Sequence, residues 1–174
     1  IVVAANASGQ ELYAAGRLQT HIERRFKQTF PILTADKLGD SVKQVYEFSG
    51  KLLKDLPFNG FTIAFAKKND INWITIQGAD MGGLIYGGEA FFDLIRKDAN
   101  GTAKVTVAAV KDWPSIPWRG RPHSVMAHQL QPGQLDAYIH ARINFSDFRD
   151  DPGQPATVKM DARKSSMGCH PGKP

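Results

Sequence analysis

The sequence has little cysteine and no long apolar run. Only Cys169 among its 174 residues is a cysteine, which excludes an intramolecular disulfide framework and a zinc site built from several cysteines. No run of about 18 apolar residues is present, so the sequence predicts no membrane-spanning helix. Gly-x-Ser-x-Gly and His-Glu-x-x-His are also missing, so neither a nucleophile elbow nor a zinc-protease helix is indicated.

The composition is that of an ordinary globular protein. Hydrophobic residues make up 42% and charged residues 22% of the chain, which argues against global disorder. The net charge of +5 permits binding to a polyanion. The basic residues are scattered, however, and no aromatic residues interleave with a basic stripe. We therefore expect an ordinary charged surface rather than a nucleic-acid interface.

A strand and a capped helix are predicted at the start of the chain. Residues 1–5 (IVVAA) form a short apolar run between polar flanks, which is typical of a buried strand. Ser8 and, three positions later, Glu11 match the capping box that begins many helices. Apolar residues at helical spacing then continue to about Phe26. The pattern predicts a helix of about four turns.

The next segments predict a strand, a helix and a hairpin. Residues 30–34 are apolar enough for a short strand. Apolar residues recur at mostly helical spacing over residues 41–56 and predict a second helix that a proline stops. Residues 60–66 and 73–77 each alternate apolar and polar side chains. With the polar residues 67–70 between them, they predict an antiparallel hairpin.

A glycine-rich helix follows the hairpin. Asp80 is the expected N-cap of a helix that runs to about Arg96, and its sequence GADMGGLIYGGEA fits neither a phosphate-binding loop nor a dinucleotide fingerprint. We interpret its glycines as positions where the helix approaches a sheet closely. Residues 105–110 predict a further strand. The predicted fold class is therefore α+β, with a mixed sheet that carries helices on one face.

The pattern changes after residue 111. Residues 112–119 (DWPSIPWR) form a linker rich in proline and tryptophan. Residues 120–150 predict a strand, a short helix over about 133–141 and another strand, which is the usual size of a parallel β-α-β unit. Residues 151–174 are rich in Pro, Gly, Ser and Lys and predict a loop or tail. Two parallel strands do not make a domain, so we expect this chain to be a fragment of a longer protein.

Two blocks of the sequence carry a resemblance to a known family. They are residues 76–95, which begin IQGADMGGLIYG, and residues 112–120, DWPSIPWRG. Together they resemble the small non-catalytic domain that precedes the barrel in family 20 glycoside hydrolases, the β-N-acetylhexosaminidases. Ile116 stands where the second block of that family has phenylalanine. The resemblance covers about residues 1–150.

The resemblance implies a domain organisation and an activity for the parent protein. It implies a hexosaminidase-like α+β domain over residues 1–111, followed after the linker by the truncated start of a (β/α)8 barrel. The parent would hydrolyse glycosidic bonds of sugars, N-acetylated ones among them, with the acetamido group of the substrate as nucleophile. No metal or other cofactor is implied. The catalytic Asp-Glu pair of the family belongs to a later strand and is absent here, so we expect the fragment to be inactive.

The barrel segment departs from the family at its sugar-binding positions. Ser124 and Ala127 stand where the first barrel strand of the family carries Asp-x-x-Arg. Asp147 and Arg149 replace the His-x-His of its second strand. Because residues two apart on a strand share a face, and the carboxyl ends of barrel strands carry the chemistry, these side chains are the best candidates for substrate contacts. The full set of predicted contacts is Asp147, Arg149, Asp150, His128 and Trp118.

Two alternatives to the glycosidase hypothesis stay open at this point. Trp113 and Trp118 could form the platform of a carbohydrate-binding or interaction module, since tryptophan rings stack on sugars, or they could stiffen the linker. A small nucleic-acid-binding domain is the weaker alternative. The exposed edge of a truncated barrel favours self-association. The partners we expect are carbohydrate and a second copy of the chain, without membrane or nucleic acid, in a secreted or periplasmic parent.

Overall fold

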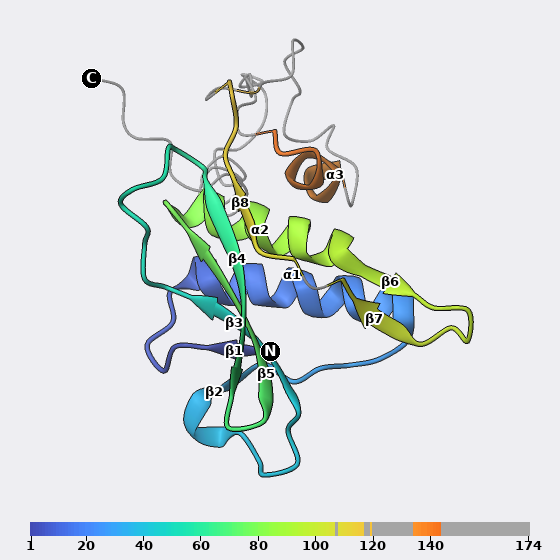
Figure 1. Ribbon diagram of the computed structural model, residues 1–174. Coiled ribbons are helices and arrows are strands. Elements are labelled where there is room, and N and C mark those ends of the chain that lie inside the picture. Colours follow the sequence, from blue (N-terminus) through green and yellow to red (C-terminus); the bar gives the residue numbers. More distant parts are fainter. Residues whose placement is uncertain (107, 117–118, 120–133, 144–174) are drawn as a thin grey trace, which may run out of the picture. The chain divides into compact units, whose positions relative to one another are not determined.

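The computed structural model describes residues 1–106, 108–116, 119 and 134–143. The chain divides into two compact units, residues 1–114 and 115–174 (Figure 1). The elements of the first unit are, in chain order, β1 (Val2–Val3), α1 (Gly9–Phe26), β2 (Leu33–Thr34), β3 (Gln44–Ser49), β4 (Phe61–Lys68), β5 (Ile71–Gly78), α2 (Met81–Leu94), β6 (Ile95–Lys97), β7 (Ala103–Val105) and β8 (Val110–Asp112). The described element of the second unit is α3 (Gln134–His140).

The first unit is built on a mixed sheet. Its strand order is β2-β1-β3-β5-β4-β8. The strands β2, β1, β3 and β5 are parallel, whereas β4 runs antiparallel to both β5 and β8. Helices α1 and α2 pack side by side against one face of this sheet (Figure 1). The mixed α+β fold is therefore confirmed.

The second unit is described only in part. Helix α3 lies within the range where a short helix was predicted. The two barrel strands expected on either side of it fall almost entirely outside the described residues. The start of a barrel therefore stays a prediction.

Helix α1 begins at the predicted capping box. The Ser8 hydroxyl accepts a hydrogen bond from the Glu11 backbone N–H at 3.2 Å, and the Ser8 N–H donates to Glu11 Oε2 at 2.8 Å. The helix ends at Lys27, which has a left-handed φ of 58° and donates its N–H to the Glu23 carbonyl. Both ends of the helix thus satisfy backbone groups that lack partners within it.

The predicted hairpin is also confirmed. Strands β4 and β5 pair from Phe61 opposite Gly78 to Lys68 opposite Ile71. The two residues of the turn, Asn69 and Asp70, have φ values of 48° and 63°. Two successive positive φ values make the backbone twist match that of the strands, which is why short hairpin turns favour Asn and Asp at these positions.

The helix predicted over residues 41–56 is wrong. The structure has strand β3 there, paired in parallel with β5 along all six of its residues. Val45 and Phe48 are 2% and 0% exposed and lie on opposite faces of this strand, because they are three residues apart. A central strand buried on both faces thus places apolar residues at a spacing that resembles one side of a helix.

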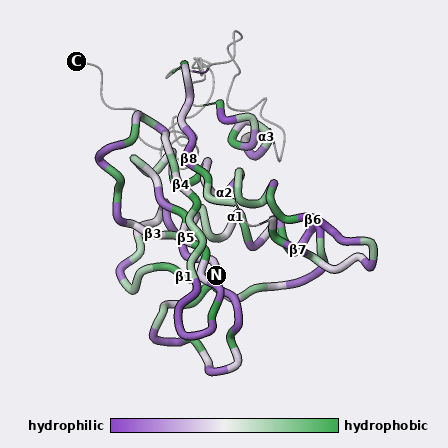
Figure 2. The backbone as a smooth tube through the Cα atoms, viewed as in Figure 1, coloured by the Kyte–Doolittle hydropathy of each residue, from purple (hydrophilic) through white to green (hydrophobic). Residues whose placement is uncertain are grey.

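The core lies between the helices and the sheet. Hydrophobic residues gather there, while the tips of the turns are hydrophilic (Figure 2). The largest fully buried side chains of the first unit are Leu18, Ile22, Phe48, Phe61, Ile63, Ile76, Leu84 and Phe91. Within the described residues, no helix is long and apolar enough to cross a membrane.

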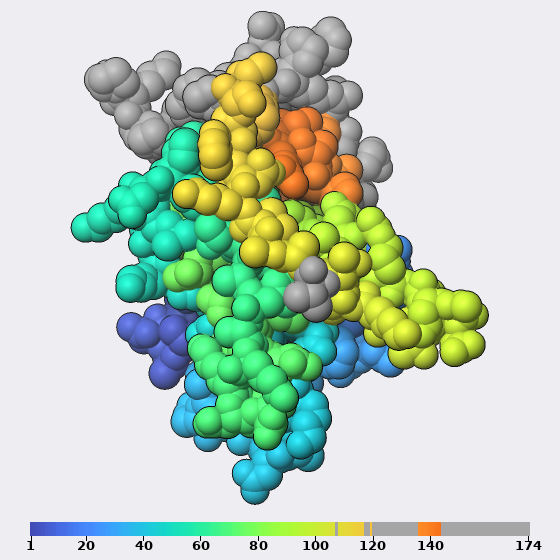
Figure 3. Space-filling view, viewed as in Figure 1, coloured from blue at the N-terminus to red at the C-terminus, as the bar shows by residue number. Residues whose placement is uncertain are grey.

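A small second sheet extends from α2. Helix α2 runs directly into β6, which pairs with β7 in an antiparallel hairpin. This hairpin projects beyond the main sheet (Figure 3). The single strand predicted over residues 105–110 is wrong, because β7 ends at Val105 and β8 begins at Val110.

Candidate functional site

The site residues predicted from sequence lie outside the part of the chain that the structure describes. These residues are His128, Trp118, Asp147, Arg149 and Asp150. They stay predictions. The candidate sites within the described residues therefore come from the geometry of the first unit.

The structure describes the linker at residues 112–116 and 119. Trp113 is 47% exposed. Arg119 donates hydrogen bonds from Nε to the Arg142 carbonyl at 2.7 Å and from Nη1 to the Ile116 carbonyl at 3.0 Å. The arginine of this sequence block thus fastens the linker to the end of α3, which is a structural role.

The aspartate of the first block caps α2 and holds a neighbouring loop. Asp80 Oδ1 accepts from the Gly83 N–H at 2.7 Å and from Asn59 Nδ2 at 3.1 Å. Its other oxygen, Oδ2, accepts from the Asn59 N–H at 2.7 Å. Both carboxylate oxygens therefore have hydrogen-bond donors, and Asp80 caps α2 and holds the loop at Asn59 in place.

The glycines of this block permit close contacts, as the sequence predicted. A Cβ at Gly83 would collide with the Gly60 carbonyl oxygen, and one at Gly78 would collide with backbone atoms at the start of α2. A Cβ at Gly87 would lie 2.8 Å from the Ile76 side chain. Each of these positions is thus limited by a named neighbour.

A buried charged cluster joins the two helices. Arg17 of α1 donates from Nε to Glu89 Oε1 of α2 at 2.7 Å. Arg17 and Glu89 are only 7% and 3% exposed. His21 Nε2 lies 3.2 Å from the same oxygen, and the imidazole stacks on Phe92 at 4.8 Å between ring centres.

The cluster fixes the charge of its members. Burial disfavours ionisation of Glu89, but hydrogen bonds from His21 and Arg17, with the charge of Arg17, outweigh it and lower the pKa of Glu89 to about 2. Burial likewise lowers the pKa of Arg17, yet Glu89 outweighs this effect and the pKa is raised. A carboxylate held this far below neutral pH is a poor proton donor, so the cluster is suited to holding helices together rather than to acid catalysis.

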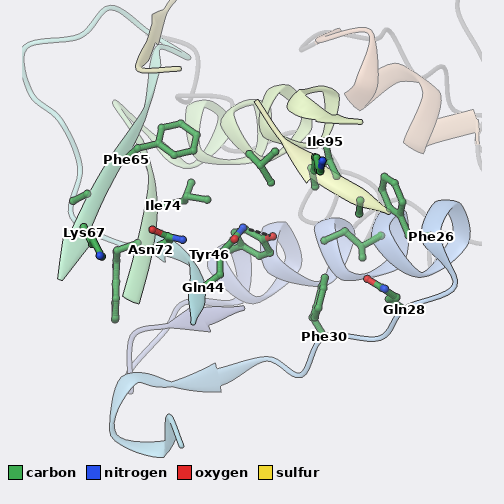
Figure 4. Close-up of a pocket in the computed structure, with 16 residues that line it drawn as sticks. Phe26, Gln28, Phe30, Gln44, Tyr46, Phe65, Lys67, Asn72, Ile74 and Ile95 are labelled. Carbon is green, nitrogen blue, oxygen red and sulfur yellow. Dashed lines mark hydrogen bonds between the residues drawn. The ribbon is translucent and has the colours of Figure 1, made fainter. Parts of the chain in front are cut away.

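The described residues form an aromatic cavity of about 550 Å³ at the end of the helix layer. Phe26, Phe30, Tyr46 and Phe65 line it from α1, the segment after α1, β3 and β4 (Figure 4). Phe30 and Tyr46 meet edge to face at 6.0 Å between ring centres. Ile95 of β6 contributes to the apolar wall. The volume falls within the range of pockets that bind small molecules.

Polar side chains complete the aromatic cavity. Gln28, Gln44, Asn72 and Lys67 are among its lining residues (Figure 4). Gln44 Nε2 donates to the Tyr46 hydroxyl at 2.7 Å, and burial raises the pKa of that phenol. The aromatic side chains can thus contact the apolar face of a ligand ring, while the amide side chains hydrogen-bond to polar groups at the edge of that ring. Among the described residues, no group of three or more His, Cys, Asp or Glu side chains could hold a metal ion.

Sequence reasoning missed this cavity. Its aromatic residues lie on segments that are far apart in the chain and meet only through the sheet order. The one local signal was the cluster of aromatics at the ends of elements, as at Phe26 and Phe30. Such residues are ordinarily core, so the pattern alone does not indicate a cavity.

Comparison with known proteins finds solved structures of similar fold. No protein-family model and no curated protein matches the sequence. The chain is similar to the GH20 chitobiase of Flavobacterium johnsoniae, with a TM-score of 0.57, 19% identity, and coverage of 83% of this chain and 22% of that one. It is also similar to an inactive mutant of the GH20 exo-β-N-acetylglucosaminidase of Vibrio harveyi, with a TM-score of 0.56, 16% identity, and coverage of 82% and 21%.

A third solved structure belongs to a different family. It is a GH138 enzyme that targets pectin rhamnogalacturonan II, with a TM-score of 0.52, 17% identity, and coverage of 82% of this chain and 18% of that chain. The chain thus spans about a fifth of the length of these proteins. At these identities the comparisons establish a likeness of fold.

Proposed function

We propose that this chain is the non-catalytic N-terminal domain of a glycosidase-type protein, followed by the start of its (β/α)8 barrel. The observation that carries the proposal is the likeness of fold, which covers 82–83% of this chain and only 18–22% of three glycoside hydrolases from two families. The α+β domain takes residues 1–111, the linker 112–119, the barrel start 120–150 and the tail 151–174.

The hydrogen bonds of two carboxylates in the first unit support a non-catalytic role. Glycoside hydrolysis commonly uses two carboxyl groups on either side of the scissile bond. Asp80, the N-cap of α2, and Glu89, within the helix, both accept structural hydrogen bonds. In this proposal the acid of the parent protein belongs to a later barrel strand, and its substrates include N-acetylated sugars.

The sugar contacts of this proposal lie at the mouth of the barrel. Asp147, Arg149 and Asp150 follow the second predicted barrel strand at its carboxyl end. His128 comes from the first barrel strand, and Trp118 comes from the linker. These residues would bind substrate and leave the chemistry to strands beyond residue 174.

An activity assay on the 174-residue chain tests the non-catalytic role. The chain is incubated with 4-nitrophenyl glycosides, the N-acetyl-β-glucosaminide among them, and release of nitrophenol is measured. We expect no release above buffer. Release that disappears in Asp147→Asn and persists in Asp98→Asn, a control carboxylate in the β6–β7 hairpin, would overturn the proposal.

The coding sequence tests the glycosidase origin. Reading it beyond the codon for Pro174 should reveal about 250 residues with alternating strand and helix patterns, which would complete a (β/α)8 barrel. An acidic pair should follow one of the later strands. A stop codon directly after Pro174 would refute the barrel, and the chain would then be a self-contained module.

Carbohydrate binding by the first unit is the second candidate function. The aromatic cavity and the half-exposed Trp113 are the observations that favour it. Calorimetric titration with chitobiose and with a glucuronoxylan fragment measures binding directly. We expect heat of binding that is lost in Tyr46→Leu if the cavity binds the sugar, or in Trp113→Ala if the linker does. No heat with either sugar would exclude this function for these ligands.

A further inference from the structure

A crevice lies where the connections of the sheet diverge. β1 lies between β2 and β3, and all three strands are parallel. The chain leaves the carboxyl end of β1 through α1 towards β2, whereas it leaves β3 towards β4 and β5 on the other side. In open sheets with parallel strands, this reversal leaves a crevice at the carboxyl ends, where ligands often bind.

The structure contains a cavity of about 630 Å³ at this position. We call it the β1–β3 crevice. Its walls are residues 2–6, 34–36 and 47–51, with Glu11 from the first turn of α1. A single water molecule occupies about 30 Å³ in the liquid, so this space is large enough for a small organic molecule.

Glu11 brings an unpartnered oxygen to the β1–β3 crevice. The residue is 5% exposed, and its Oε2 accepts from the Ser8 N–H at 2.8 Å. Its other oxygen, Oε1, is buried and has no hydrogen-bond partner within the described part of the chain. A buried carboxylate oxygen without a donor is unfavourable, so the arrangement calls for a donor from elsewhere.

Gly50 packs directly against that oxygen. A Cβ at this position would lie 2.5 Å from Glu11 Oε1 and 2.8 Å from its carboxyl carbon. Any side chain here would displace the carboxylate. The present position of the Glu11 carboxylate therefore requires glycine at residue 50, directly after β3.

The charges around the β1–β3 crevice favour a donor-rich ligand. Three acidic residues line it, Glu11, Asp36 and Glu47, against one basic residue, Lys51. Glu47 is held in place, because its Oε2 accepts from Trp73 Nε1 at 2.7 Å and from the Thr75 hydroxyl at 2.8 Å. The acidic excess disfavours anions and favours neutral or cationic molecules that carry O–H or N–H groups.

We infer that the β1–β3 crevice binds a saccharide-sized ligand rich in hydroxyl or amino groups, and that the Glu11 carboxylate, whose Oε1 is closed off from solvent in the ligand-free chain, turns to accept a hydrogen bond from it. The inference depends only on residues 2–51 and 73–75. It therefore stands or falls separately from the barrel and from the activity of a parent protein.

Nuclear magnetic resonance on the 15N-labelled 174-residue chain tests the site. Glucosamine, N-acetylglucosamine and glucuronate are titrated separately, and backbone amide shifts are followed. We expect saturable shifts at Asn6, Glu11, Gly50 and Lys51. Shifts with both glucosamine and N-acetylglucosamine would show that binding does not require the ammonium, and shifts with glucosamine alone would identify its ammonium as the donor. No shift in the crevice with either sugar, or equal shifts with glucuronate, would overturn the inference.

Variants at Glu11 separate a binding role from a structural one. Glu11→Gln keeps a side chain that can complete the capping box but removes the charge, and we expect it to weaken binding about tenfold or more, since charge-assisted hydrogen bonds are the stronger ones. Glu23→Gln, at an exposed position of the same helix, is the matched control and should bind as the original chain does. Unchanged affinity in Glu11→Gln would contradict the inference.

Gly50→Ala provides a second, independent variant. It displaces the Glu11 carboxylate and should abolish the amide shifts at the crevice. The dispersed amide spectrum of the remaining residues reports whether the variant is folded. A folded Gly50→Ala variant with undiminished binding would also overturn the inference.

Discussion

The N-termini of α1 and α2 are both capped by side-chain oxygens, from Ser8 and Asp80, but differ in what surrounds them. At α2, Asp80 uses both carboxylate oxygens for three donors, and backbone fills the space around Gly83. At α1, Glu11 uses one oxygen in its capping box, and the other lies unpartnered beside Gly50.

The difference teaches that a cap motif specifies where a helix begins and not what else its side chains do. The loop after residue 57 closes over the start of α2, because Asn59 donates to Asp80 twice. The loop after β3 does not supply such a donor to Glu11 among the described residues. Substitutions should therefore destabilise the fold more at the closely packed start of α2 than at the start of α1, which lies beside a cavity.

Gly83→Ala should have the largest effect. Its Cβ would collide with the Gly60 carbonyl, which is backbone and cannot rotate away. We expect a loss of more than about 4 kcal/mol in the free energy of unfolding, or no folded protein. Urea denaturation followed by circular dichroism measures it. Gly16→Ala, in the middle of α1 with no atom within 4 Å of the new Cβ, should instead stabilise by about 0.5–1 kcal/mol. Equal effects of the two substitutions would contradict the comparison.

Glu89→Gln should have the second-largest effect on stability, because the ion pair of Glu89 with Arg17 holds α1 and α2 together. Removing the carboxylate leaves Arg17 buried without its counter-charge, and we expect a loss of roughly 3 kcal/mol at neutral pH. The same variant is the control when the stability of the original chain is measured at low pH.

The pH dependence has a defined direction. The pKa of Glu89 is lowered from 4.5 to about 2 in the folded chain. Its contribution to stability is therefore fully present above about pH 4.5 and is lost as the pH falls towards 2. Urea midpoints measured across this window should fall more steeply for the original chain than for Glu89→Gln. Parallel curves would show that Glu89 does not carry this dependence.

Asp80→Ala should cost about 2 kcal/mol, from the lost cap and from the Asn59 N–H left without its acceptor. Asp80→Asn keeps an acceptor oxygen and should cost less. Thermal unfolding of the two variants gives the order. A smaller loss in Asp80→Ala than in Asp80→Asn would mean that the hydrogen bonds accepted by residue 80 do not stabilise this cap.

Glu11→Gln should have the smallest effect on the ligand-free chain. The glutamine can still accept from Ser8, and replacing an unpartnered charged oxygen removes an unfavourable burial. We expect a change within about 0.5 kcal/mol, in either direction. A loss as large as that of Asp80→Ala would mean that Oε1 has a structural partner, and the contrast between the two helix starts would disappear.

Local signals in the sequence predicted much of this fold. The capping box at Ser8, the Asn69–Asp70 turn and the close contacts of the glycines in α2 each depend on a few neighbouring residues, and each is confirmed. The helix expected over residues 41–56 failed, because this segment is held as strand β3 by pairing with β1 and β5. Pairing with distant strands cannot be read from the spacing of Val45 and Phe48.

The candidate sites were less predictable than the fold. The β1–β3 crevice depends on strand order and on the absence of a side chain at Gly50, and neither is a motif. Glu11 was recognised as part of a cap, but a capping box does not reveal that one of its oxygens lacks a donor. The aromatic cavity likewise joins Phe26 to Phe65 only through the folded sheet.

The hydrogen bond from Trp73 to Glu47 gives the chain an optical reporter. The indole N–H donates to a carboxylate that lines the β1–β3 crevice, and Lys68 lies 4.7 Å from the centre of the ring. The chain has three tryptophans, so replacing Trp113 and Trp118 with phenylalanine leaves Trp73 as the only indole emitter. A molecule that enters the crevice and draws Glu47 away then changes the wavelength and intensity of that single emission, so occupancy can be followed in solution without a label.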